Sequence, residues 1–499
     1  MPEPRPLRVV LAEAGVGPGD VLTGEGPHVS GVTHDSRLVQ PGDLYAALPG
    51  FVTHGARFAA QAVSAGAVAI LTDPAGLAEC SDVDVPCVSV ADPRGVLGDV
   101  AAAVYGHPAR ALTMIGITGT NGKTTTCQMV AAGLRASGRT VGVIGTAGIR
   151  IGNRFLEAAR TTPEATDLHA LLAIMRDEGV AAVAMEVSSH ALALGRVGGV
   201  EFDIACFTNL TQDHLDFHGT MDAYFAAKSS LFEPGRVRTA VIAIDDDYGR
   251  RLARSCGVPM VTCALDSHDA DWSGEVVSTA GDGQEIRITD RGGAVASVQV
   301  GLPGRFNAAN ALTAWAILRS LDVPTDAISA GLSTVRVPGR MEVVAVCRNT
   351  TFLVDYAHSP DAVQRVLESI RSTTRGKVLC VIGCGGDRDR DKRPIMGRIA
   401  AELCDIVVIT DDNPRSEDPS QIRLQMLHGV DAVPLQQRAE VLEIGDRRQA
   451  IRAAVRQAAP GDVVIVLGKG HERGQEVAGI VHPFDDRTEL SAAVAEVAA

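Results

Sequence analysis

Short apolar runs alternate with polar, glycine-rich loops and helical patterns along most of this chain. In the middle of the sequence, the runs MIGITGT, VGVIGT, VAMEVSS, IACFTNL and AVIAIDDD each end in polar or glycine residues. The same rhythm restarts further on with FLVDYAHSP, VLCVIGCGGD, IVVITDDNP and VVIVLGKGHE. Buried strands that alternate with helices are typical of βαβ units around a mostly parallel sheet. The pattern predicts an α/β fold, with an added hairpin where EIRITD and ASVQVGL flank Arg291-Gly292-Gly293.

Changes in this pattern divide the chain into three blocks. The first block has short β-like runs and ends in a connector at Tyr105–Arg110, and a second boundary is expected within Thr334–Glu342. We predict an N-terminal domain over residues 1–108, a central P-loop domain with a mostly parallel sheet over 109–335, and a C-terminal Rossmann-like α/β domain over 336–499. Polar loops follow the strands of the last two domains. Open parallel sheets bind ligands at the carboxyl ends of their strands. We therefore expect a ligand cleft between the central and the C-terminal domain.

Composition and charge narrow the class of protein. The 499 residues are 46% hydrophobic and only 4% aromatic, which suits α/β layers better than a β-sandwich. The net charge is −14 and no run of lysine or arginine stands out, so nucleic acid is not an expected partner. No apolar run approaches the length of a membrane span, and the first residues lack the apolar core of a signal peptide. The scattered cysteines indicate reduced, mostly buried thiols, and we expect a cytoplasmic protein without membrane insertion.

The stretch MIGITGTNGKTTTCQMV, Met114–Val130, departs from a strict P-loop, which has glycine where this chain has Ile117. It still joins a buried strand to a helix that should end at Gly138. At such a junction backbone N–H groups can hold phosphates, Lys123 can reach the terminal phosphates and Thr124 can bind Mg²⁺. A glycine-rich turn without a ligand is the alternative. A lysine followed by three threonines at a helix start favours nucleotide binding.

Carboxylates and histidines follow two further strands. Glu186 in MEVSSH comes directly after a strand, where a carboxylate suits Mg²⁺, although a residue there is often only a helix cap or a surface charge. Asp213, His214, Asp216 and His218 cluster in NLTQDHLDFHGTM. These residue types fit a metal site or the cap of a helix equally well, so the residues alone leave both open.

Other polar groups match the edges of a base or an anion. Asn307 and Asn310 lie on the first turn of an apolar helix, where they would contact a base or cap the helix. In the third block, basic residues follow one strand, and DDNPR and GKGHE follow two others. Guanidinium groups match carboxylates and phosphates, so three such loops at one sheet edge favour ligand binding over a solvated surface. The basic residues are Arg388, Arg390, Lys392 and Arg393.

Ten segments together resemble the Mur ligase family, from about residue 30 to residue 475. They are GITGTNGKTTT, TTPE, MEVSSHAL, NLTQDHLDFHGTM, FNAANALTA, PGRMEVV, DYAHSPDA, GCGGDRDRDKRPIMG, TDDNPRSEDP and GKGHE. The resemblance implies an ATP-dependent acid–amino-acid ligase of peptidoglycan synthesis, and thus of cell wall biogenesis, cell shape and cell division. It implies that meso-diaminopimelate is added to the D-Glu γ-carboxylate of UDP-MurNAc-L-Ala-D-Glu through an acyl-phosphate. A monomer with two Mg²⁺ sites is expected.

The resemblance also implies a role for particular residues. Those expected to bind ATP are Gly119, Thr120, Asn121, Gly122, Lys123, Thr124, Thr125, Asn307, Asn310, Arg340, Asp355 and His358. Those expected to bind the UDP-MurNAc-dipeptide, with the UDP moiety in the first domain, are Ser36, Thr53, His54, Thr161, Thr162, Ser188 and Arg196. The expected diaminopimelate pocket is Arg388, Asp412, Asn413, Arg415, Gly468 and Glu472. The expected catalytic residues are Lys123, Glu186, His214 and Lys228, and the expected metal ligands are Thr124, Glu186, His214 and a carbamylated Lys228.

Specificity is expected to depend on Arg415, which would pair with the distal carboxylate that diaminopimelate has and lysine lacks. At Leu194 the chain departs from some family members, which have glutamine there and one more hydrogen bond to the muramoyl-peptide. The same reaction with L-lysine and a folylpolyglutamate synthetase-like ligase are alternatives. A P-loop switch or transport ATPase is a further alternative, but it leaves the motifs of the third domain unexplained.

Overall fold

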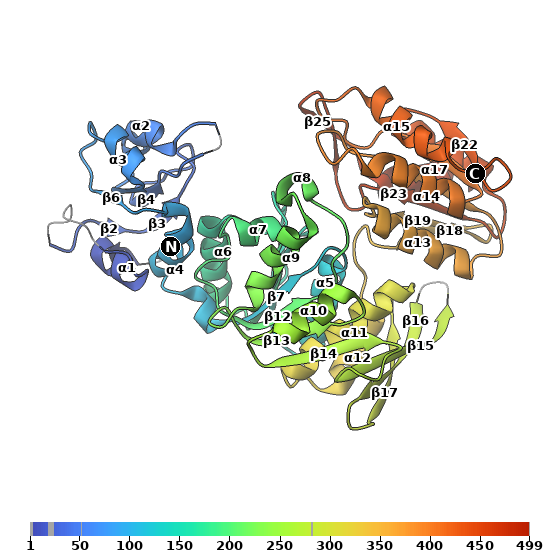
Figure 1. The fold of residues 1–499 in the computed structure, drawn as a ribbon, viewed down its shortest axis with the longest axis horizontal. Coiled ribbons are helices and arrows are strands. Elements are labelled where there is room, and N and C mark those ends of the chain that lie inside the picture. The colour runs from blue at the N-terminus through green and yellow to red at the C-terminus, as the bar shows by residue number, and fades with distance from the viewer. Residues whose placement is uncertain (1–2, 18–23, 51, 281–282, 499) are drawn as a thin grey trace.

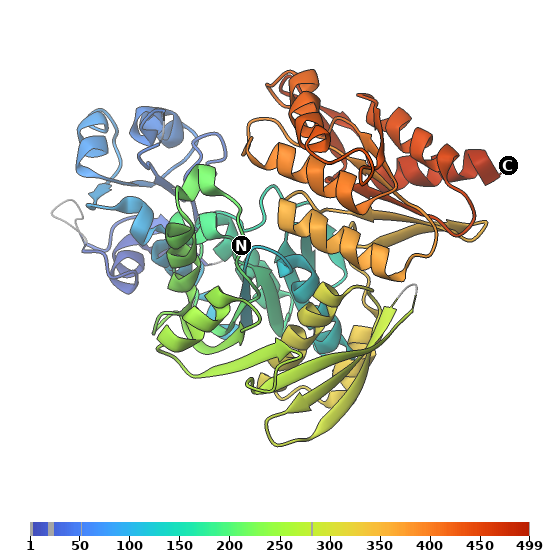
Figure 2. The same cartoon turned by 45° about the vertical axis from the view of Figure 1, so that its right-hand side comes forward.

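The computed structural model describes residues 3–17, 24–50, 52–280 and 283–498. The main sheets, of four, eleven and six strands, lie in successive parts of the chain. The part with the eleven-stranded sheet lies between the other two, and the C-terminal part stands over one end of it (Figures 1 and 2). This arrangement confirms the predicted α/β fold. The boundaries at residues 108 and 335 stay a prediction.

The N-terminal part is a small parallel sheet covered by short helices. Its strands are β3 (Gly31–Thr33), β4 (Asp43–Ala46), β5 (Ala69–Thr72) and β6 (Cys87–Ser89), all paired in parallel. An antiparallel pair, β1 (Arg5–Pro6) and β2 (His28–Val29), lies beside it. The helical elements are α1 (Leu7–Glu13), η1 (Gly55–Phe58), α2 (Ala59–Ser64), α3 (Pro74–Glu79), α4 (Pro93–Val104) and η2 (Pro108–Ala111).

The central sheet has the strand order β10-β9-β8-β11-β7-β12-β13-β14-β15-β16-β17 and is parallel from β8 to β15. Antiparallel strands extend it at both edges. The strands are β7 (Thr113–Thr118), β8 (Val141–Gly145), β9 (Gly148–Ile151), β10 (Arg154–Leu156), β11 (Ala182–Glu186), β12 (Phe202–Phe207), β13 (Val237–Ala243), β14 (Met260–Leu265), β15 (Trp272–Ala280), β16 (Gly283–Asp290) and β17 (Val295–Val300). The pairing of β16 with β17 confirms the predicted hairpin.

Helices cover both faces of this sheet, because its side chains alternate between two hydrophobic cores. Ile115 and Ile117 of β7 belong to one core, and Met114 belongs to the other. The helical elements are α5 (Lys123–Ala136), α6 (Ala165–Asp177), α7 (Ser189–Ala193), α8 (Leu215–His218), α9 (Met221–Ser229), η3 (Ser230–Phe232), α10 (Asp247–Ser255), α11 (Arg305–Ser320) and α12 (Thr325–Thr334).

The C-terminal part repeats this layered design. Its sheet has the order β18-β19-β23-β20-β21-β22, and only β18 is antiparallel to its neighbour. The strands are β18 (Glu342–Cys347), β19 (Thr350–Asp355), β20 (Val378–Ile382), β21 (Ile406–Ile409), β22 (Glu440–Glu443) and β23 (Val463–Leu467), with a separate hairpin of β24 (Gly474–Val477) and β25 (Ile480–Pro483). The helices are α13 (Pro360–Thr373), α14 (Lys392–Leu403), α15 (Pro419–Asp431), α16 (Arg447–Gln457) and α17 (Asp486–Ala498).

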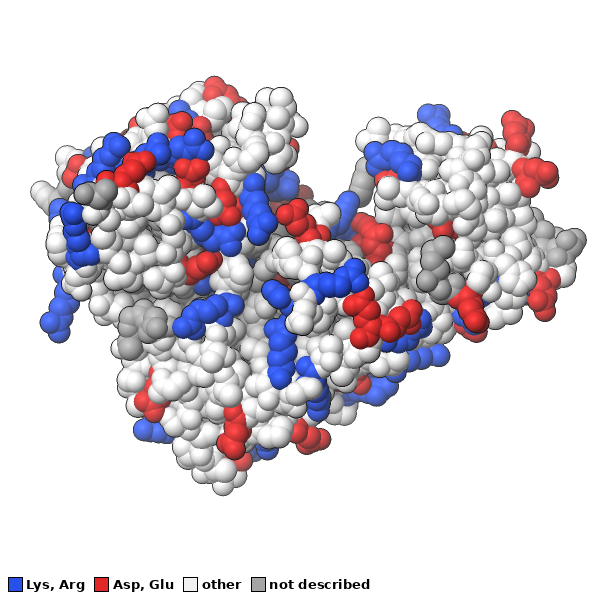
Figure 3. Space-filling view, turned by 180° about the vertical axis from the view of Figure 1, so that it is seen from behind, with Lys and Arg blue, Asp and Glu red and all other residues white. Residues whose placement is uncertain are grey.

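Seen from behind, basic and acidic side chains are interspersed over the molecule, without a continuous basic stripe on this face (Figure 3). None of the helices in the described ranges is both long and apolar enough to span a membrane.

Candidate active site

The P-loop joins β7 to α5, as predicted. Gly119 and Gly122 have φ of +146° and +87°, and a Cβ on Gly122 would lie 2.3 Å from Asn310 Oδ1. Glycine is required there because the turn needs both a left-handed backbone and a close approach. Lys123 donates from Nζ to the carbonyl oxygens of Gly119 and Thr120, both at 2.9 Å. The lysine therefore lies folded back over the loop at the start of the helix.

Residues after β12 hold the P-loop in shape. Thr208 donates to the Asn121 carbonyl at 2.6 Å, and the Asn121 N–H donates to Asn209 Oδ1 at 2.9 Å. The Asn209 carbonyl accepts the Thr120 N–H at 2.9 Å. Sequence reasoning did not single out Thr208 and Asn209. Their position directly after a strand of the same sheet was the available signal.

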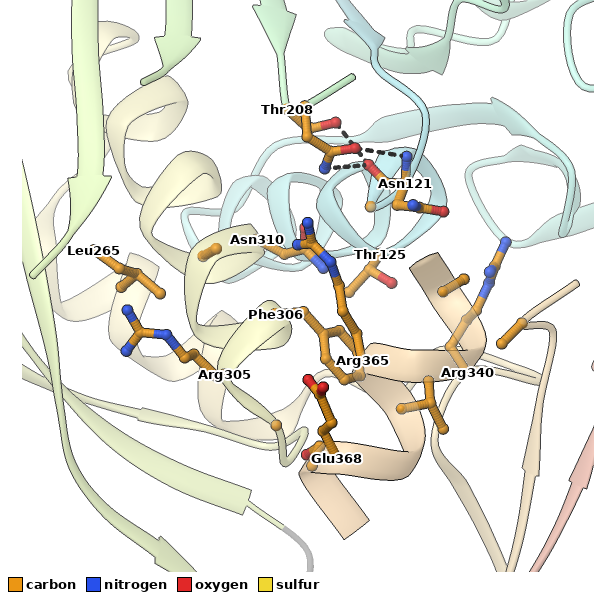
Figure 4. Close-up of a pocket in the computed structure, with 18 of the residues that line it drawn as sticks. Asn121, Thr125, Thr208, Leu265, Arg305, Phe306, Asn310, Arg340, Arg365 and Glu368 are labelled. Atoms are coloured by element: carbon orange, nitrogen blue, oxygen red, sulfur yellow. Dashed lines mark hydrogen bonds between the residues drawn. The ribbon is translucent and has the colours of Figure 1, made fainter. Parts of the chain in front are cut away.

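A cavity of about 830 Å³ opens beside the P-loop, between the central and C-terminal parts. In Figure 4, Asn121, Asn310 and Phe306 face it from the central part, and Arg340, Arg365 and Glu368 face it from the C-terminal part. This volume suits a nucleotide-sized ligand. Six of the residues expected to bind ATP line it: Asn121, Gly122, Thr125, Asn310, Arg340 and Asp355. The other six, Gly119, Thr120, Lys123, Thr124, Asn307 and His358, are not among its lining residues.

The two asparagines of α11 do not cap it. Gly304 occupies the N-cap position, and Asn307 and Asn310 are buried inside the helix. Asn307 donates to the Pro303 carbonyl at 2.8 Å and accepts from Asn310 Nδ2 at 3.2 Å. The helix-cap alternative is therefore wrong for both, and only Asn310 reaches the cavity.

Glu186 lies buried at the end of β11 and accepts two hydrogen bonds from one residue. The N–H of Thr146 donates to Oε1 at 2.8 Å, and the Thr146 hydroxyl donates to Oε2 at 3.3 Å. Glu186 is not a helix cap, because the following helix α7 is capped by Ser188. Thr146 was not predicted from the sequence and lies in the turn between β8 and β9.

Residues expected to hold the muramoyl-dipeptide surround Glu186. Thr162 donates to the Glu186 carbonyl at 2.8 Å and accepts from the Ser188 N–H at 3.1 Å, and the hydroxyl oxygens of Thr146 and Thr161 lie 3.1 Å apart. Arg196 forms an ion pair with Glu164 at 2.9 Å, which Arg94 of α4 also approaches at 3.7 Å. The structure therefore brings Thr161, Thr162, Ser188 and Arg196 together. Leu194 ends α7 nearby.

Lys228 is buried on α9 and is not a surface lysine. Its Nζ donates to the Gly119 carbonyl at 2.8 Å and lies 4.7 Å from the centre of the Tyr224 ring. Burial lowers its pKa well below the ordinary value, and the nearby charge of Lys123 lowers it further. Both effects favour the neutral amine of Lys228 over its ammonium form.

In the acidic and histidine cluster the His214 side chain does not cap the helix that follows it, and the metal-site alternative stays a prediction. His214 occupies the N-cap position of α8 with φ of +53°, without a capping hydrogen bond from its side chain. Asp213 lies 3.4 Å from His214 Nε2. In the described part of the chain, no group of three or more His, Cys, Asp or Glu side chains is arranged to hold a metal. The ring of His190 on α7 packs against His214 and His218 instead, with centroids 4.9 and 5.7 Å apart.

Three C-terminal residues form a stack that faces the P-loop, called the Tyr356 stack below: Arg340, Tyr356 and His471. The Arg340 guanidinium lies 4.5 Å from the centre of the Tyr356 ring, and the ring of His471 stacks on the same tyrosine at 5.1 Å. Arg340 donates to Thr124 Oγ1 at 3.3 Å, and His471 Nε2 lies 2.8 Å from the Thr146 carbonyl. Sequence reasoning missed Tyr356 and His471, although DYAHSP and GKGHE contain them.

The expected amino-acid pocket forms around a buried lysine that was also missed. Lys469 donates to Asn413 Oδ1 at 3.0 Å and to Glu472 Oε2 at 2.8 Å. Asn413 donates to the same Glu472 oxygen at 2.9 Å. Asp412 lies against Gly468, where a Cβ would be 2.4 Å from Oδ2. Asp412, Asn413, Gly468 and Glu472 are thus brought together after β21 and β23.

The arginines near this pocket differ in role. Arg415 has φ of +52°, donates to the Gly386 carbonyl at 2.6 Å and lies 3.4 Å from Glu476. Arg388 is exposed and donates to the Asp387 carbonyl at 3.1 Å. Arg393 is fully buried and pairs through two nitrogens with Glu417, so its guanidinium is occupied inside the fold and is not available to a ligand.

The residues expected to contact UDP lie in the N-terminal part. His54 caps η1 by accepting the Ala56 N–H on Nδ1 at 3.0 Å, and its Nε2 lies 3.1 Å from Asp73. Thr53 precedes it and is half-buried, and Ser36 is buried. All three therefore lie in the segments that follow β3 and β4 of the small sheet.

The chain matches known domain families over three successive ranges. The family described as Mur ligase family, catalytic domain, matches residues 28–105, the Mur ligase middle domain matches 117–318, and the glutamate ligase domain of Mur ligases matches 339–470. Curated proteins from Streptomyces avermitilis and Geobacillus kaustophilus are 50% and 43% identical over 504 and 481 residues. The alignments cover 98% and 95% of this chain and 98% and 96% of those proteins. Both are named UDP-N-acetylmuramoyl-L-alanyl-D-glutamate–2,6-diaminopimelate ligase.

Solved structures agree with this relationship. A structure with the same ligase name is 32% identical, with a TM-score of 0.66, and covers 94% of this chain and 95% of its own. A folylpolyglutamate synthase from Mycobacterium tuberculosis, complexed with ADP and AMPPCP, is 20% identical with a TM-score of 0.60. It covers 74% of this chain and 91% of its own, so its likeness supports the fold alone. The three domain matches and the identity over nearly the whole chain place this protein in the Mur ligase family.

Proposed function

We propose that this Mur ligase joins meso-diaminopimelate to the D-Glu γ-carboxylate of UDP-MurNAc-L-Ala-D-Glu with hydrolysis of ATP. The names of its relatives at 43–50% identity support this reaction, which belongs to peptidoglycan precursor synthesis. One structural observation carries the proposal: the C-terminal part contacts the P-loop itself. Asn121 donates to Asp361 Oδ2 at 2.9 Å, and Arg340 donates to Thr124 at 3.3 Å. The contacts bring the parts that carry the P-loop and the amino-acid pocket together.

The chemistry follows from the weakness of a carboxylate as an acylating agent. A γ-carboxylate oxygen attacks the γ-phosphorus of ATP and ADP leaves, which gives an acyl-phosphate. The amine of diaminopimelate then attacks the acyl carbon, and the tetrahedral intermediate expels phosphate and loses a proton. Because two anions must meet, the site has to offset their repulsion. Lys123 and Arg340 supply positive charge at the P-loop for this purpose.

Metal ligands are part of this proposal. The Thr124 hydroxyl and the Glu186 carboxylate are hard oxygen donors of the kind that Mg²⁺ prefers. Mg²⁺ would neutralise phosphate charge beside these two residues. A second Mg²⁺ is proposed near His214 and a carbamate on Lys228. The buried position of Lys228 and its lowered pKa favour that modification, because only an uncharged amine adds CO₂ to give a carbamate and a proton.

We extend the proposal to the remaining assignments. The residues expected to bind ATP, the UDP-dipeptide and diaminopimelate keep those roles, with Arg415 on the distal carboxylate. A cytoplasmic monomer is proposed, since the nucleotide substrates are cytoplasmic metabolites. The two alternative ligase reactions differ in substrate and can be tested side by side.

Phosphate release provides the test. The protein is incubated with ATP, Mg²⁺ and UDP-MurNAc-L-Ala-D-Glu, together with meso-diaminopimelate, L-lysine or no amine, and products are identified by mass. A parallel tube contains tetrahydrofolate and L-glutamate. Release confined to the diaminopimelate tube is expected. Turnover with lysine alone would overturn the pocket assignment, turnover with folate would favour the folylpolyglutamate alternative, and equal release in every tube would indicate an uncoupled ATPase.

A further inference from the structure

His471 is a contact between the amino-acid pocket and the central part of the molecule. It lies in the loop after β23, and its Nε2 reaches the carbonyl oxygen of Thr146 at 2.8 Å. These residues are 325 positions apart in the sequence, and their contact crosses from the C-terminal to the central part. No role is assigned to either residue by the reaction described above.

Thr146 is in turn hydrogen-bonded to Glu186. Its N–H and its hydroxyl donate to the two carboxylate oxygens of Glu186, at 2.8 and 3.3 Å. A carboxylate held by two donors of one residue takes its orientation from that residue. His471 therefore fixes the backbone of the residue that orients Glu186.

The Tyr356 stack contacts the central part of the molecule at two places. The ring of His471 and the guanidinium of Arg340 both pack against the Tyr356 ring, and Arg340 donates a hydrogen bond to Thr124 at 3.3 Å. One end of the stack thus reaches Thr124 and the other reaches the neighbour of Glu186. These are the two residues proposed to hold Mg²⁺ beside the nucleotide.

The backbone packs closely between the Tyr356 stack and the amino-acid pocket. A Cβ on Gly339 would lie 2.2 Å from the backbone nitrogen of His471, and a Cβ on Gly470 would lie 2.7 Å from Cβ of Tyr356. Glu472, which follows His471, accepts hydrogen bonds from Lys469 and Asn413 in the pocket. Movement of the pocket backbone therefore moves the imidazole.

The imidazole is suited to a fixed hydrogen bond. Burial and, to a smaller extent, the charge of Arg340 lower the pKa of His471 to about 4. The ring is neutral under physiological conditions, so a proton on Nε2 is donated to the Thr146 carbonyl. Its Nδ1 is buried without a partner among the described residues.

We propose that His471 is a positioning residue that couples the amino-acid pocket to the orientation of Glu186 through Thr146. The inference rests on the proposed ligase function. It implies that docking of the C-terminal part completes the site for acyl-phosphate formation. Packing between two domains is the competing explanation, and it differs in its kinetic consequences.

Variants of His471 separate the two explanations. His471→Ala removes the donor, and His471→Gln keeps an amide N–H that can reach the same carbonyl. His428→Ala, at an exposed histidine on α15, is the matched control. The rate of diaminopimelate-dependent phosphate release is measured against each substrate and against Mg²⁺, and thermal unfolding is followed by circular dichroism.

A fall in kcat of about tenfold or more is expected for His471→Ala, with a higher half-saturating Mg²⁺ and KM for ATP within about twofold. His471→Gln is expected to recover most of the loss. Adding Thr146→Val should cost less in the alanine variant than in the wild type, because both changes disturb one connection. An unchanged kcat, or a glutamine variant no better than alanine, would overturn the inference. Absence of diaminopimelate-dependent release in the wild type would instead overturn the proposed function.

Discussion

Lys123 and Lys228 donate hydrogen bonds to the same acceptor, the carbonyl oxygen of Gly119, at 2.9 and 2.8 Å. One lysine begins α5 and the other lies on α9. Two ammonium groups beside one carbonyl would repel each other, and the charge of Lys123 lowers the pKa of buried Lys228. The proximity of the two amines therefore favours the neutral form of Lys228 next to the P-loop.

Carbamylation of Lys228 is the first prediction. In buffer with ¹³C-bicarbonate, the wild-type protein is expected to show a carbamate ¹³C resonance that Lys228→Met lacks. The same variant should lose activity by about 100-fold or more, because the proposed second Mg²⁺, which would neutralise charge in the transition state, loses a ligand. Lys377→Met, at an exposed lysine, is the control and should keep both the resonance and the activity. A resonance that persists in Lys228→Met would exclude this site of modification.

Elements whose signal is local could be predicted from the sequence. Residues that act through contacts between distant segments could not. The turn from β7 to α5 was predictable because glycine, lysine and threonine stand side by side in one strand–turn–helix segment. Thr146, Lys469 and His471 were not, because their roles arise from contacts between distant segments. Arg393 shows the opposite error. It lies among basic residues that look like an anion site, but its partner Glu417 is 24 positions away.

Gly122 and Gly138 provide a matched pair at the two ends of α5. Both have positive φ, +87° and +85°, but a Cβ on Gly122 would lie 2.3 Å from Asn310 Oδ1, whereas nothing lies within 4 Å of a Cβ on Gly138. Gly122→Ala is expected to abolish ATP binding in a calorimetric titration, because Asn310 and the P-loop must move apart. Gly138→Ala carries only the backbone cost of about 1–2 kcal/mol in stability and should bind ATP normally. Equal affinities in the two variants would contradict this reading of the loop.

Arg415 is predicted to select diaminopimelate over lysine. Its contacts with Gly386 and Glu476 use two of its five N–H donors and leave others for the distal carboxylate. Arg415→Met is expected to lower kcat/KM for diaminopimelate by about 100-fold or more, while the rate with lysine does not fall. Arg438→Met is the control, because the two arginine side chains are similarly exposed, at 23% and 22%. A loss of the same size in both variants would remove Arg415 from the pocket.

Lys469 is predicted to hold the amino-acid pocket in shape. Lys469→Met leaves Glu472 without its buried counter-charge and removes one of the two donors to Asn413 Oδ1, the other being the Glu476 N–H. We expect KM for diaminopimelate to rise by about tenfold or more, with KM for ATP nearly unchanged, as steady-state kinetics would measure. A rise in both KM values would indicate a general disturbance of the C-terminal part, and the exposed Lys377→Met should change neither.

His169 is predicted to make stability depend on pH. It is fully buried on α6, its Nε2 donates to the Gly198 carbonyl at 2.9 Å, and burial lowers its pKa from 6.5 to about 4. Because the folded state holds this proton less tightly than the unfolded state, the stability from neutral His169 is complete above pH 6.5. It is lost progressively as the pH falls from 6.5 towards 4. Between pH 7.5 and pH 5.0 the loss should be about 2 kcal/mol.

His169→Gln isolates this contribution, because the glutamine amide can still donate to Gly198 but does not titrate. Urea unfolding at the two pH values should show a smaller drop in the free energy of unfolding for the variant, by about 2 kcal/mol. The other histidines whose pKa is lowered to about 4, such as His214 and His358, are present in both proteins and cancel in the comparison. A Cβ on Gly98 of α4 would lie 2.5 Å from the backbone of Gly198, so the two glycines pack closely. Protonation of His169 therefore acts on the junction of the N-terminal and central parts. The same pH dependence in both proteins would mean that His169 stays neutral, or finds a partner, when the chain is acidified.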